Sequence, residues 1–112
     1  MTLRTLATGA LALALAGPAL AAEPIKIGIP VGLSGANSVV APSVVQSAEY
    51  AAKQINDAGG ILGRQVELVV ADDNSGAQGA QRAFESLVYE EEVDVLISME
   101  TSAARNAGLP IV

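Results

Sequence analysis

The hydrophobic positions of the chain follow a strand-like pattern in three segments. Ile25–Val31 alternates and is rich in Ile and Val, as in a strand. Residues 66–70 form a β-branched run of the kind that is buried in a parallel sheet, and residues 93–98 have the same character. Pro30 has no N–H to donate, so we expect it at the end of the first strand rather than within the ladder.

Apolar residues recur at helical spacing between the first two strands. They form one continuous face, which comprises Val44, Ala48, Ala51, Ala52 and Ile55. The start of this helix stays open: Pro42 can be its first residue, or Ser43 can cap it with a glutamine three positions on. Gly59 or Gly60 is expected to take the left-handed conformation that closes a helix, and Gly63 permits a second turn.

A second helix is expected over residues 77–89. Ser75 and Gln78 have the spacing of a capping box. The buried stripe comprises Ala80, Ala83, Phe84, Leu87 and Val88. The run Glu90-Glu91-Glu92 that follows is unfavourable there, because negative charge at a helix C-terminus opposes the helix dipole. The order β-α-β-α-β with short loops predicts an α/β fold with a parallel sheet and right-handed crossovers.

Residues 101–112 allow two interpretations. Thr101 or Ser102 can cap a helix that continues through Ala103. Gly108 and Pro110 would weaken or kink that helix, so the alternative ends it at Gly108 and makes residues 109–112 a fourth strand. Because the chain stops in this apolar stretch, we expect it to be the N-terminal part of a longer protein.

The first 21 residues have the organisation of a secretory signal peptide. Arg4 precedes an apolar run, a Gly-Pro pair breaks that run, and Ala19-Leu20-Ala21 supplies an A-x-A cleavage pattern. The apolar run is too short to span a bilayer. We therefore expect cleavage after Ala21, which the intact mass of the exported protein checks. No cysteine is present to carry a lipid or a disulfide, so we expect a soluble periplasmic product with no stable membrane insertion.

Composition removes several classes of function. The chain has 12 Asp+Glu against 6 Lys+Arg and few aromatics, so it lacks the surface of a nucleic-acid binder. It has no histidine and no cysteine, so these residues cannot build a Ser-His-Asp triad or the common zinc and copper sites. Gly28 and Gly32 do not complete the G-x-G-x-x-G pattern of dinucleotide enzymes. We expect neither catalysis nor a bound cofactor or metal.

Three loops are expected to meet at the carboxyl edge of the sheet, where open α/β sheets bind their ligands. They are residues 33–38, 72–76 and 99–102. In the first loop, Ser34 and Gly35 either contact a ligand or simply make a turn. In the second, Asp72 and Asp73 resemble a calcium or acid–base pair, but a hard cation needs six or more oxygens, which favours a role in closing the strand.

The third loop precedes the last predicted helix. The Ser102 hydroxyl and the N–H groups of Ala103 and Ala104 lie at its N-terminus, which favours a carboxylate or an amide oxygen. The alternative is that Ser102 only caps the helix. Glu100 can pair with a ligand ammonium, or it is a solvated loop charge.

Several motifs together resemble one protein family. They are Ile25-Lys-Ile-Gly-Ile29, Leu33-Ser34-Gly35, Ile55-Asn56-x-Ala58-Gly59-Gly60-Ile61-Leu62-Gly63-Arg64 and Val66-Glu67-Leu68-Val69-x-x-Asp72-Asp73. In this order they look like the N-terminal lobe of periplasmic binding proteins of the leucine/isoleucine/valine type, which serve branched-chain amino acid ABC transporters. The resemblance implies a flavodoxin-like type I lobe over residues 22–112, incomplete in this chain. The loops expected at the carboxyl edge of this lobe make the predicted ligand-binding residues Ser34, Gly35, Glu100, Thr101, Ser102 and Ala103.

The same resemblance implies a second lobe joined by a hinge, a small amino-acid ligand and the permease subunits of an ABC transporter as partners. The ending Thr101-Ser-Ala-Ala-Arg-x-Ala-x-Leu-Pro-Ile-Val112 looks more like the urea and short-chain amide branch, in which this stretch is a helix running through its proline. That favours a helix to the end of the chain and keeps urea or an amide, for uptake or signalling, as the alternative ligand class. Residues 36–40 lack the aromatic that members often place against the ligand, and Glu100 stands where the amide branch often has an aromatic.

Overall fold

The computed structural model describes residues 21–98 and 101–112, and the predicted signal peptide lies almost wholly outside them. The strands are β1 (Ile25–Val31), β2 (Val66–Asp72) and β3 (Val95–Leu96). The helices are α1 (Ala41–Asp57), α2 (Ala77–Glu85) and α3 (Ser102–Gly108). A short 3₁₀ turn, η1 (Gly35–Asn37), precedes α1, and a π-helical turn, η2 (Ser86–Glu90), continues α2.

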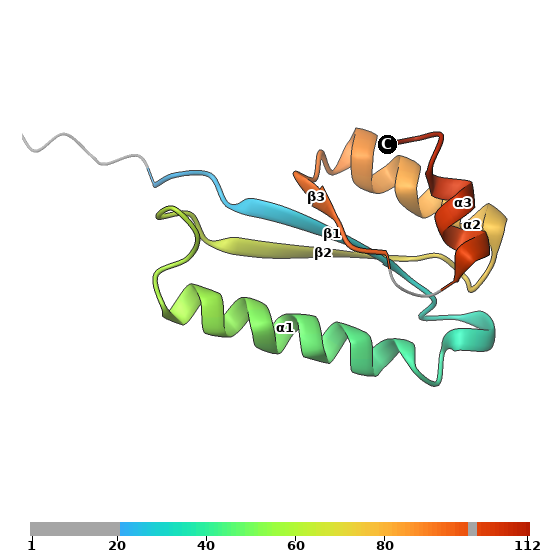
Figure 1. Cartoon of the computed structure of the whole chain (residues 1–112), viewed down its shortest axis with the longest axis horizontal. Helices are drawn as coiled ribbons and strands as arrows, with labels where there is room; N and C mark the ends of the chain where they lie inside the picture. The colour runs from blue at the N-terminus through green and yellow to red at the C-terminus, as the bar shows by residue number, and fades with distance from the viewer. Residues whose placement is uncertain (1–20, 99–100) are drawn as a thin grey trace, which may run out of the picture.

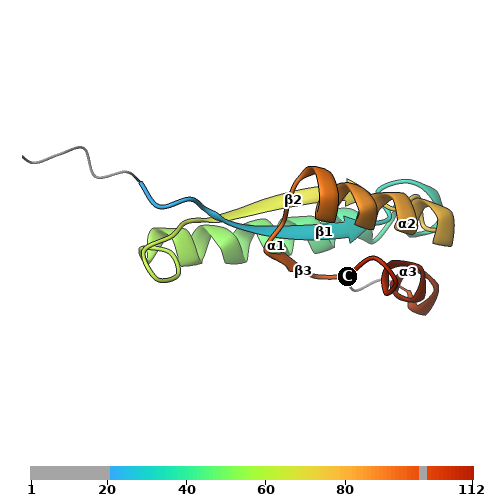
Figure 2. The ribbon, with the colours of Figure 1, turned by 90° about the horizontal axis from the view of Figure 1, so that it is seen from above.

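The three strands form one parallel sheet in the order β2-β1-β3, which confirms the predicted α/β class and element order. The register pairs Ile25 with Val66 and Val31 with Asp72, so β1 and β2 end together. Helix α1 lies along one side of the sheet and α2 along the other, with α3 packed beside α2 (Figure 1; Figure 2). This layering leaves the carboxyl ends of the strands as a free edge, where loops gather.

Pro30 explains why the pairing between β1 and β3 is short. The Ile25 N–H donates to Gln65 O and Val31 O accepts from Asp73 N, so the odd-numbered residues of β1 bond to β2. The even-numbered ones face β3, since Lys26 O accepts from Asp94 N. Pro30 therefore lies within the pairing with β2, one residue before the strand end, and its missing donor faces β3.

Strand β3 is shorter than the predicted segment 93–98. It pairs with β1 only at Ile27↔Val95 and Gly28↔Leu96, and the last hydrogen bond on this side runs from Ile97 N to Gly28 O among the described residues. The next position along β1 is Pro30, which offers no N–H. The prediction of a six-residue strand was therefore wrong, because the partner strand cannot support it.

Helix α1 begins at Ala41, with Val40 in the capping position and Pro42 in the first turn. The alternative in which Ser43 caps the helix was wrong, because the Ser43 N–H donates to Val40 O inside the first turn. Ala51 is exposed rather than buried, since the buried face is rotated toward Val45. The hydrophobic core lies between α1 and the sheet. Its residues on α1 are Ala41, Val44, Val45 and Ala48, and its residues on β1 and β2 are Ile27, Ile29, Val31, Leu68 and Val70.

The helix end and the turn into β2 follow the prediction. Gly59 and Gly60 both have positive φ, +104° and +80°, and the Gly60 N–H donates to Ile55 O at 2.9 Å. Asn56 then holds the start of β2 with two hydrogen bonds. Its Nδ2 donates to Val66 O at 2.9 Å, and its Oδ1 accepts from Val66 N at 2.7 Å.

The predicted stripe of α2 is confirmed, with Ala80, Ala83, Phe84 and Leu87 buried and Val88 half-buried. The predicted capping box was wrong. Gly76 occupies the capping position, and no side chain caps the helix. Ser75 has a positive φ of +53°, and its hydroxyl donates to Ser34 O in another loop. A long-range contact has therefore replaced the local cap.

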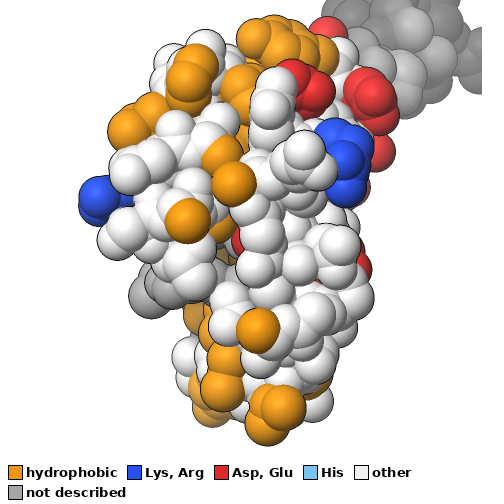
Figure 3. Space-filling model, turned by 90° about the vertical axis from the view of Figure 1, so that its right-hand side faces the viewer, with side chains coloured by type: hydrophobic (Ala, Val, Ile, Leu, Met, Phe, Trp, Pro, Cys, Tyr) orange, Lys and Arg blue, Asp and Glu red, His pale blue; other side chains and the backbone are white. Residues whose placement is uncertain are grey.

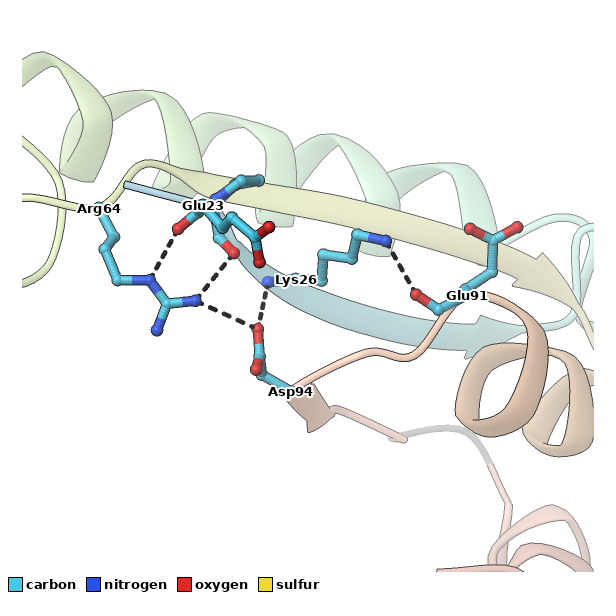
Figure 4. Close-up of polar contacts among 6 residues, drawn as sticks. Glu23, Lys26, Arg64, Glu91 and Asp94 are labelled. Carbon is cyan, nitrogen blue, oxygen red and sulfur yellow. Dashed lines mark hydrogen bonds and ion pairs between the residues drawn. The ribbon is translucent and has the colours of Figure 1, made fainter. Parts of the chain in front are cut away.

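The amino-terminal edge of the sheet is closed by polar contacts (Figure 4). Arg64 Nε donates to Glu23 O at 2.7 Å and its Nη2 to Pro24 O at 3.0 Å. Lys26 Nζ donates to Glu91 O at 2.9 Å, which places a cation at the end of η2. The Asp94 carboxylate accepts from Lys26 N at 2.9 Å. Lys26 thus offsets the unfavourable end of the Glu90-Glu91-Glu92 run.

Helix α3 begins after Thr101, whose Oγ1 accepts from Ala104 N at 3.0 Å. It ends at Gly108 and a turn follows over residues 109–111, in which the Ile111 N–H donates to Gly108 O. A helix to the end of the chain and a fourth strand are therefore both wrong. Gly108 lies close to the Phe84 ring, where an added Cβ would be 2.4 Å from Phe84 Cε1. No helix within residues 21–98 and 101–112 combines the length and apolarity that a bilayer span needs.

Candidate functional site

Two of the three predicted loops meet at the carboxyl edge of the sheet. The Asp72 carboxylate, at the end of β2, accepts from Ser34 N at 3.1 Å and from Asn74 N at 2.9 Å, both through Oδ1. The Ser34 hydroxyl donates to Asn74 Oδ1 at 2.8 Å. One carboxylate therefore joins the loop after β1 to the loop after β2.

Ser75 makes a second connection between the same loops. Its hydroxyl donates to Ser34 O at 2.6 Å and accepts from Asn37 N at 2.9 Å. Asn74 and Ser75 have φ of +52° and +53°, a conformation that residues other than glycine adopt at a cost. The cross-loop hydrogen bonds hold this strained turn in place.

Gly35 fits a space that no other residue can occupy without movement. Its φ is +79°, and a Cβ there would lie 2.7 Å from Asn74 O and 3.0 Å from Ser75 Cβ. The predicted turn role of Ser34 and Gly35 is therefore confirmed. Gly35 itself is exposed at the edge, so a turn role and a ligand contact are compatible.

Asp73 closes the strand. It is 1% exposed, its Oδ1 accepts from Ser75 N at 2.8 Å, and its carbonyl accepts from Gly76 N at 3.2 Å. These bonds confirm the predicted loop-closing role of the aspartate pair. Among residues 21–98 and 101–112, no group of three or more carboxylates, histidines or cysteines is placed to hold a metal ion.

The Ser34 side chain has the largest effect on the pKa of Asp72, followed by the Asn74 N–H, and together they hold it below the ordinary value of 3.8. A lowered folded-state pKa adds stability that is complete above the unfolded-state pKa and is lost as the pH falls through the folded-state pKa.

We expect the wild type to lose more stability between about pH 5 and pH 2 than Asp72→Asn, as measured by urea unfolding. An equal loss in both proteins would contradict this role.

The third predicted loop is only partly described, because Glu100 lies outside the described residues. Thr101 uses its hydroxyl to cap α3, while Ser102 and Ala103 are exposed in the first turn. Helix α3 begins at the same end of the molecule as η1 (Figure 1; Figure 2). The hydrogen bonds given above join the first two loops, and the contact of the third with a ligand stays a prediction.

Two features of this edge were missed from the sequence. The link through Ser75 could not be found, because its spacing to Gln78 indicated a helix cap. The second feature is apolar: hydrophobic side chains gather over the loop that leads into α1, at the bottom of the view onto this edge (Figure 3). The exposed ones near this loop are Leu33, Val39 and Val40, and Val39 is 86% exposed.

A hollow of about 560 Å³ lies elsewhere, between α2, β3 and α3. Its lining is mainly apolar and includes Phe84, Leu96 and Leu109. None of the predicted binding residues that the structure describes lines this hollow. We therefore place the candidate site at the polar loops rather than at this hollow.

A parallel α/β lobe whose polar loops gather at the carboxyl edge of its sheet is the architecture of a ligand-binding lobe. The chain belongs to the periplasmic binding protein family, whose model matches residues 24–112.

Relatives and solved structures agree on this family. Leu/Ile/Val-binding protein homolog 1 of Brucella abortus is 41% identical over 63 residues, which are 56% of this chain and 16% of that protein. Leu/Ile/Val-binding protein BraC3 of Rhizobium johnstonii is 42% identical over 73 residues, 65% of this chain and 20% of that protein. The chain thus spans a small part of the length of the curated relatives it matches.

Among solved structures, the branched-chain amino acid transporter substrate-binding protein LivJ from Streptococcus pneumoniae, in complex with isoleucine, has a TM-score of 0.73 and 32% identity. The match covers 78% of this chain and 25% of that one. The leucine-binding protein LivK from Thermotoga maritima has a TM-score of 0.68 and 28% identity, and covers 78% of this chain and 24% of that one.

Proposed function

We propose that this chain is part of the solute-binding component of an ABC transporter that takes up a branched-chain amino acid. The observation that carries the proposal is the likeness of the lobe to LivJ in complex with isoleucine, at 32% identity. The partners proposed are the permease subunits of the transporter. We propose export to the periplasm, with cleavage after Ala21, and no catalytic role.

The chemistry of the carboxyl edge supports an amino acid. Such a ligand presents a carboxylate, an ammonium and an apolar side chain. Ser102 and the N–H of Ala103, in the exposed first turn of α3, suit the carboxylate. Ser34 and Gly35 lie on the loop after β1, at the same end of the lobe, and Glu100 is proposed as the partner of the ammonium.

The apolar part of the ligand has a matching surface on the same side of the lobe. Leu33, Val39 and Val40 are exposed close to the Ser34 loop in the sequence. An exposed apolar group beside a polar site gains stability when a ligand side chain covers it. Urea and acetamide have little or no apolar side chain to offer, so this surface favours the amino acid over the alternative.

The test is a ligand screen on the protein expressed from its whole gene. We expect leucine, isoleucine and valine to raise the melting temperature, because a ligand at a hundred times its Kd adds about 2.7 kcal/mol to stability. Calorimetry should then give one-to-one binding. Stabilisation by urea or acetamide alone would support the alternative ligand class, and no stabilisation by any of the five compounds would contradict the proposal.

The chain by itself serves as a comparison in the same screen. A cleft gains affinity by burying most of the ligand between its walls. Residues 22–112 supply one part of one wall, so we expect them to bind the same amino acids far more weakly than the whole protein.

A further inference from the structure

We propose that Asp72 is a positioning residue for ligand binding, which holds the loop of Ser34 and Gly35 in the conformation that contacts the ligand. The inference rests on the proposed function, and adds a residue that does not itself touch the ligand. It assigns a binding role to a side chain for which the sequence favoured a role in closing the strand.

The geometry of Asp72 suits this role because its own position is fixed by the sheet. Asp72 is the last residue of β2 and pairs in register with Val31, the last residue of β1. From this fixed point, Oδ1 accepts one N–H from each loop, Ser34 N at 3.1 Å and Asn74 N at 2.9 Å. Hydrogen bonds to a charged acceptor are stronger than those between neutral groups.

All three polar groups of Ser34 are bonded to the second loop. Its N–H donates to Asp72, its hydroxyl donates to Asn74 Oδ1 and its carbonyl accepts from the Ser75 hydroxyl. The single hydroxyl proton faces two acceptors of this loop, Asn74 Oδ1 and the Asp72 carboxylate, so the hydroxyl oxygen can act only as an acceptor toward a further group, such as a ligand ammonium. Asp72 fixes the backbone of Ser34, and so fixes the direction in which the hydroxyl oxygen points.

A purely structural role for Asp72 has a matched control at the other end of the same strand. Asn56, in α1, also holds an end of β2 through two hydrogen bonds to the backbone, one donated to Val66 O and one accepted from Val66 N. Loss of either side chain removes two hydrogen bonds to the backbone. Only Asp72 lies at the edge where the ligand is proposed to bind.

The experiment compares Asp72→Ala, Asp72→Asn and Asn56→Ala in the protein expressed from its whole gene. The readouts are the Kd for isoleucine by calorimetry, the melting temperature, and the hydrogen exchange rate of the Ser34 N–H. We expect Asp72→Ala to raise Kd about tenfold or more and to speed exchange at Ser34, because the loop loses its fixed acceptor. Asp72→Asn keeps an acceptor oxygen, so its Kd should stay within about threefold of the wild type.

Asn56→Ala separates positioning from stability. We expect it to lower the melting temperature about as much as Asp72→Ala while Kd changes by less than about twofold, since additivity holds for distant sites. Equal losses of affinity in Asp72→Ala and Asn56→Ala would overturn the proposal, as would unchanged exchange at Ser34 in Asp72→Ala. If the wild type binds none of the tested amino acids, the proposed function fails, while the exchange rates still decide whether Asp72 holds the loop.

Discussion

Replacing Gly79 with alanine is expected to lower the free energy of unfolding by about 3 kcal/mol, as overpacking against a rigid neighbour does. A Cβ at this position would lie 2.0 Å from Asp73 O and 2.6 Å from Asp73 C. Backbone atoms cannot rotate away as a side chain can, so α2 must shift or the loop must move. In an exposed helix interior the same change would add about 1 kcal/mol of stability, so the sign of the effect is diagnostic.

Gly76→Ala is the control for this prediction. Gly76 caps the N-terminus of α2 with an extended φ of −152°, and the nearest atom to an added Cβ is Asn74 O at 3.8 Å. We expect its effect on stability to be below about 1 kcal/mol. Urea unfolding of both variants in the whole protein measures the difference. A Gly79→Ala protein as stable as the wild type would show that α2 does not lie so close to the end of β2.

The local sequence predicted the class of the fold because each signal was physically independent of the others. The strand Ile25–Val31, the glycine turn at Gly59 and Gly60, and the stripe of α2 were each set by side-chain period or by backbone freedom. Tertiary contacts reinforced these elements rather than competing with them. The order of elements and the parallel sheet could therefore be predicted from the alternation of strand-like and helix-like hydrophobic segments.

The errors lie where a distant residue decides the outcome. Strand β3 ends early because Pro30, 65 positions before Val95 in the numbering, offers no donor on that side. Ser75 leaves the capping position because Ser34 and Asn37 occupy its hydroxyl. Gly108, the last residue of α3, lies close to the ring of Phe84 on α2. None of these contacts can be predicted from the spacing of residues along the chain.

The candidate site was predicted in outline because the carboxyl ends of parallel strands must share one edge. Ser34 and Gly35 lie there as expected, and the aspartate pair closes its loop. The mutual contacts of these residues could not be predicted, since they depend on the positive φ of Asn74 and Ser75. Lys26 and Arg64 lie at the opposite edge, where each donates to backbone carbonyl oxygens.

Gly35→Ala is expected to affect both stability and ligand affinity. The left-handed φ of +79° costs alanine about 1–2 kcal/mol, and the overlap with Asn74 O at 2.7 Å adds a cost of similar size. Relief of the overlap requires the Ser34 loop to move away from Asn74 and Ser75. Because this loop is proposed to contact the ligand, we expect Kd for isoleucine to rise about tenfold or more, as measured by calorimetry on the whole protein.

Gly63→Ala separates the cost of the left-handed φ from the cost of the overlap with Asn74. Gly63 has nearly the same φ, +77°, but no atom lies within 4 Å of an added Cβ. It lies in the turn before β2, at the edge opposite the candidate site. We expect it to cost only the conformational term, about 1–2 kcal/mol, and to leave Kd unchanged. If Gly35→Ala and Gly63→Ala prove equally destabilising and neither alters Kd, the Ser34 loop does not depend on close contact with Asn74, and the ligand must be bound by other residues of this edge.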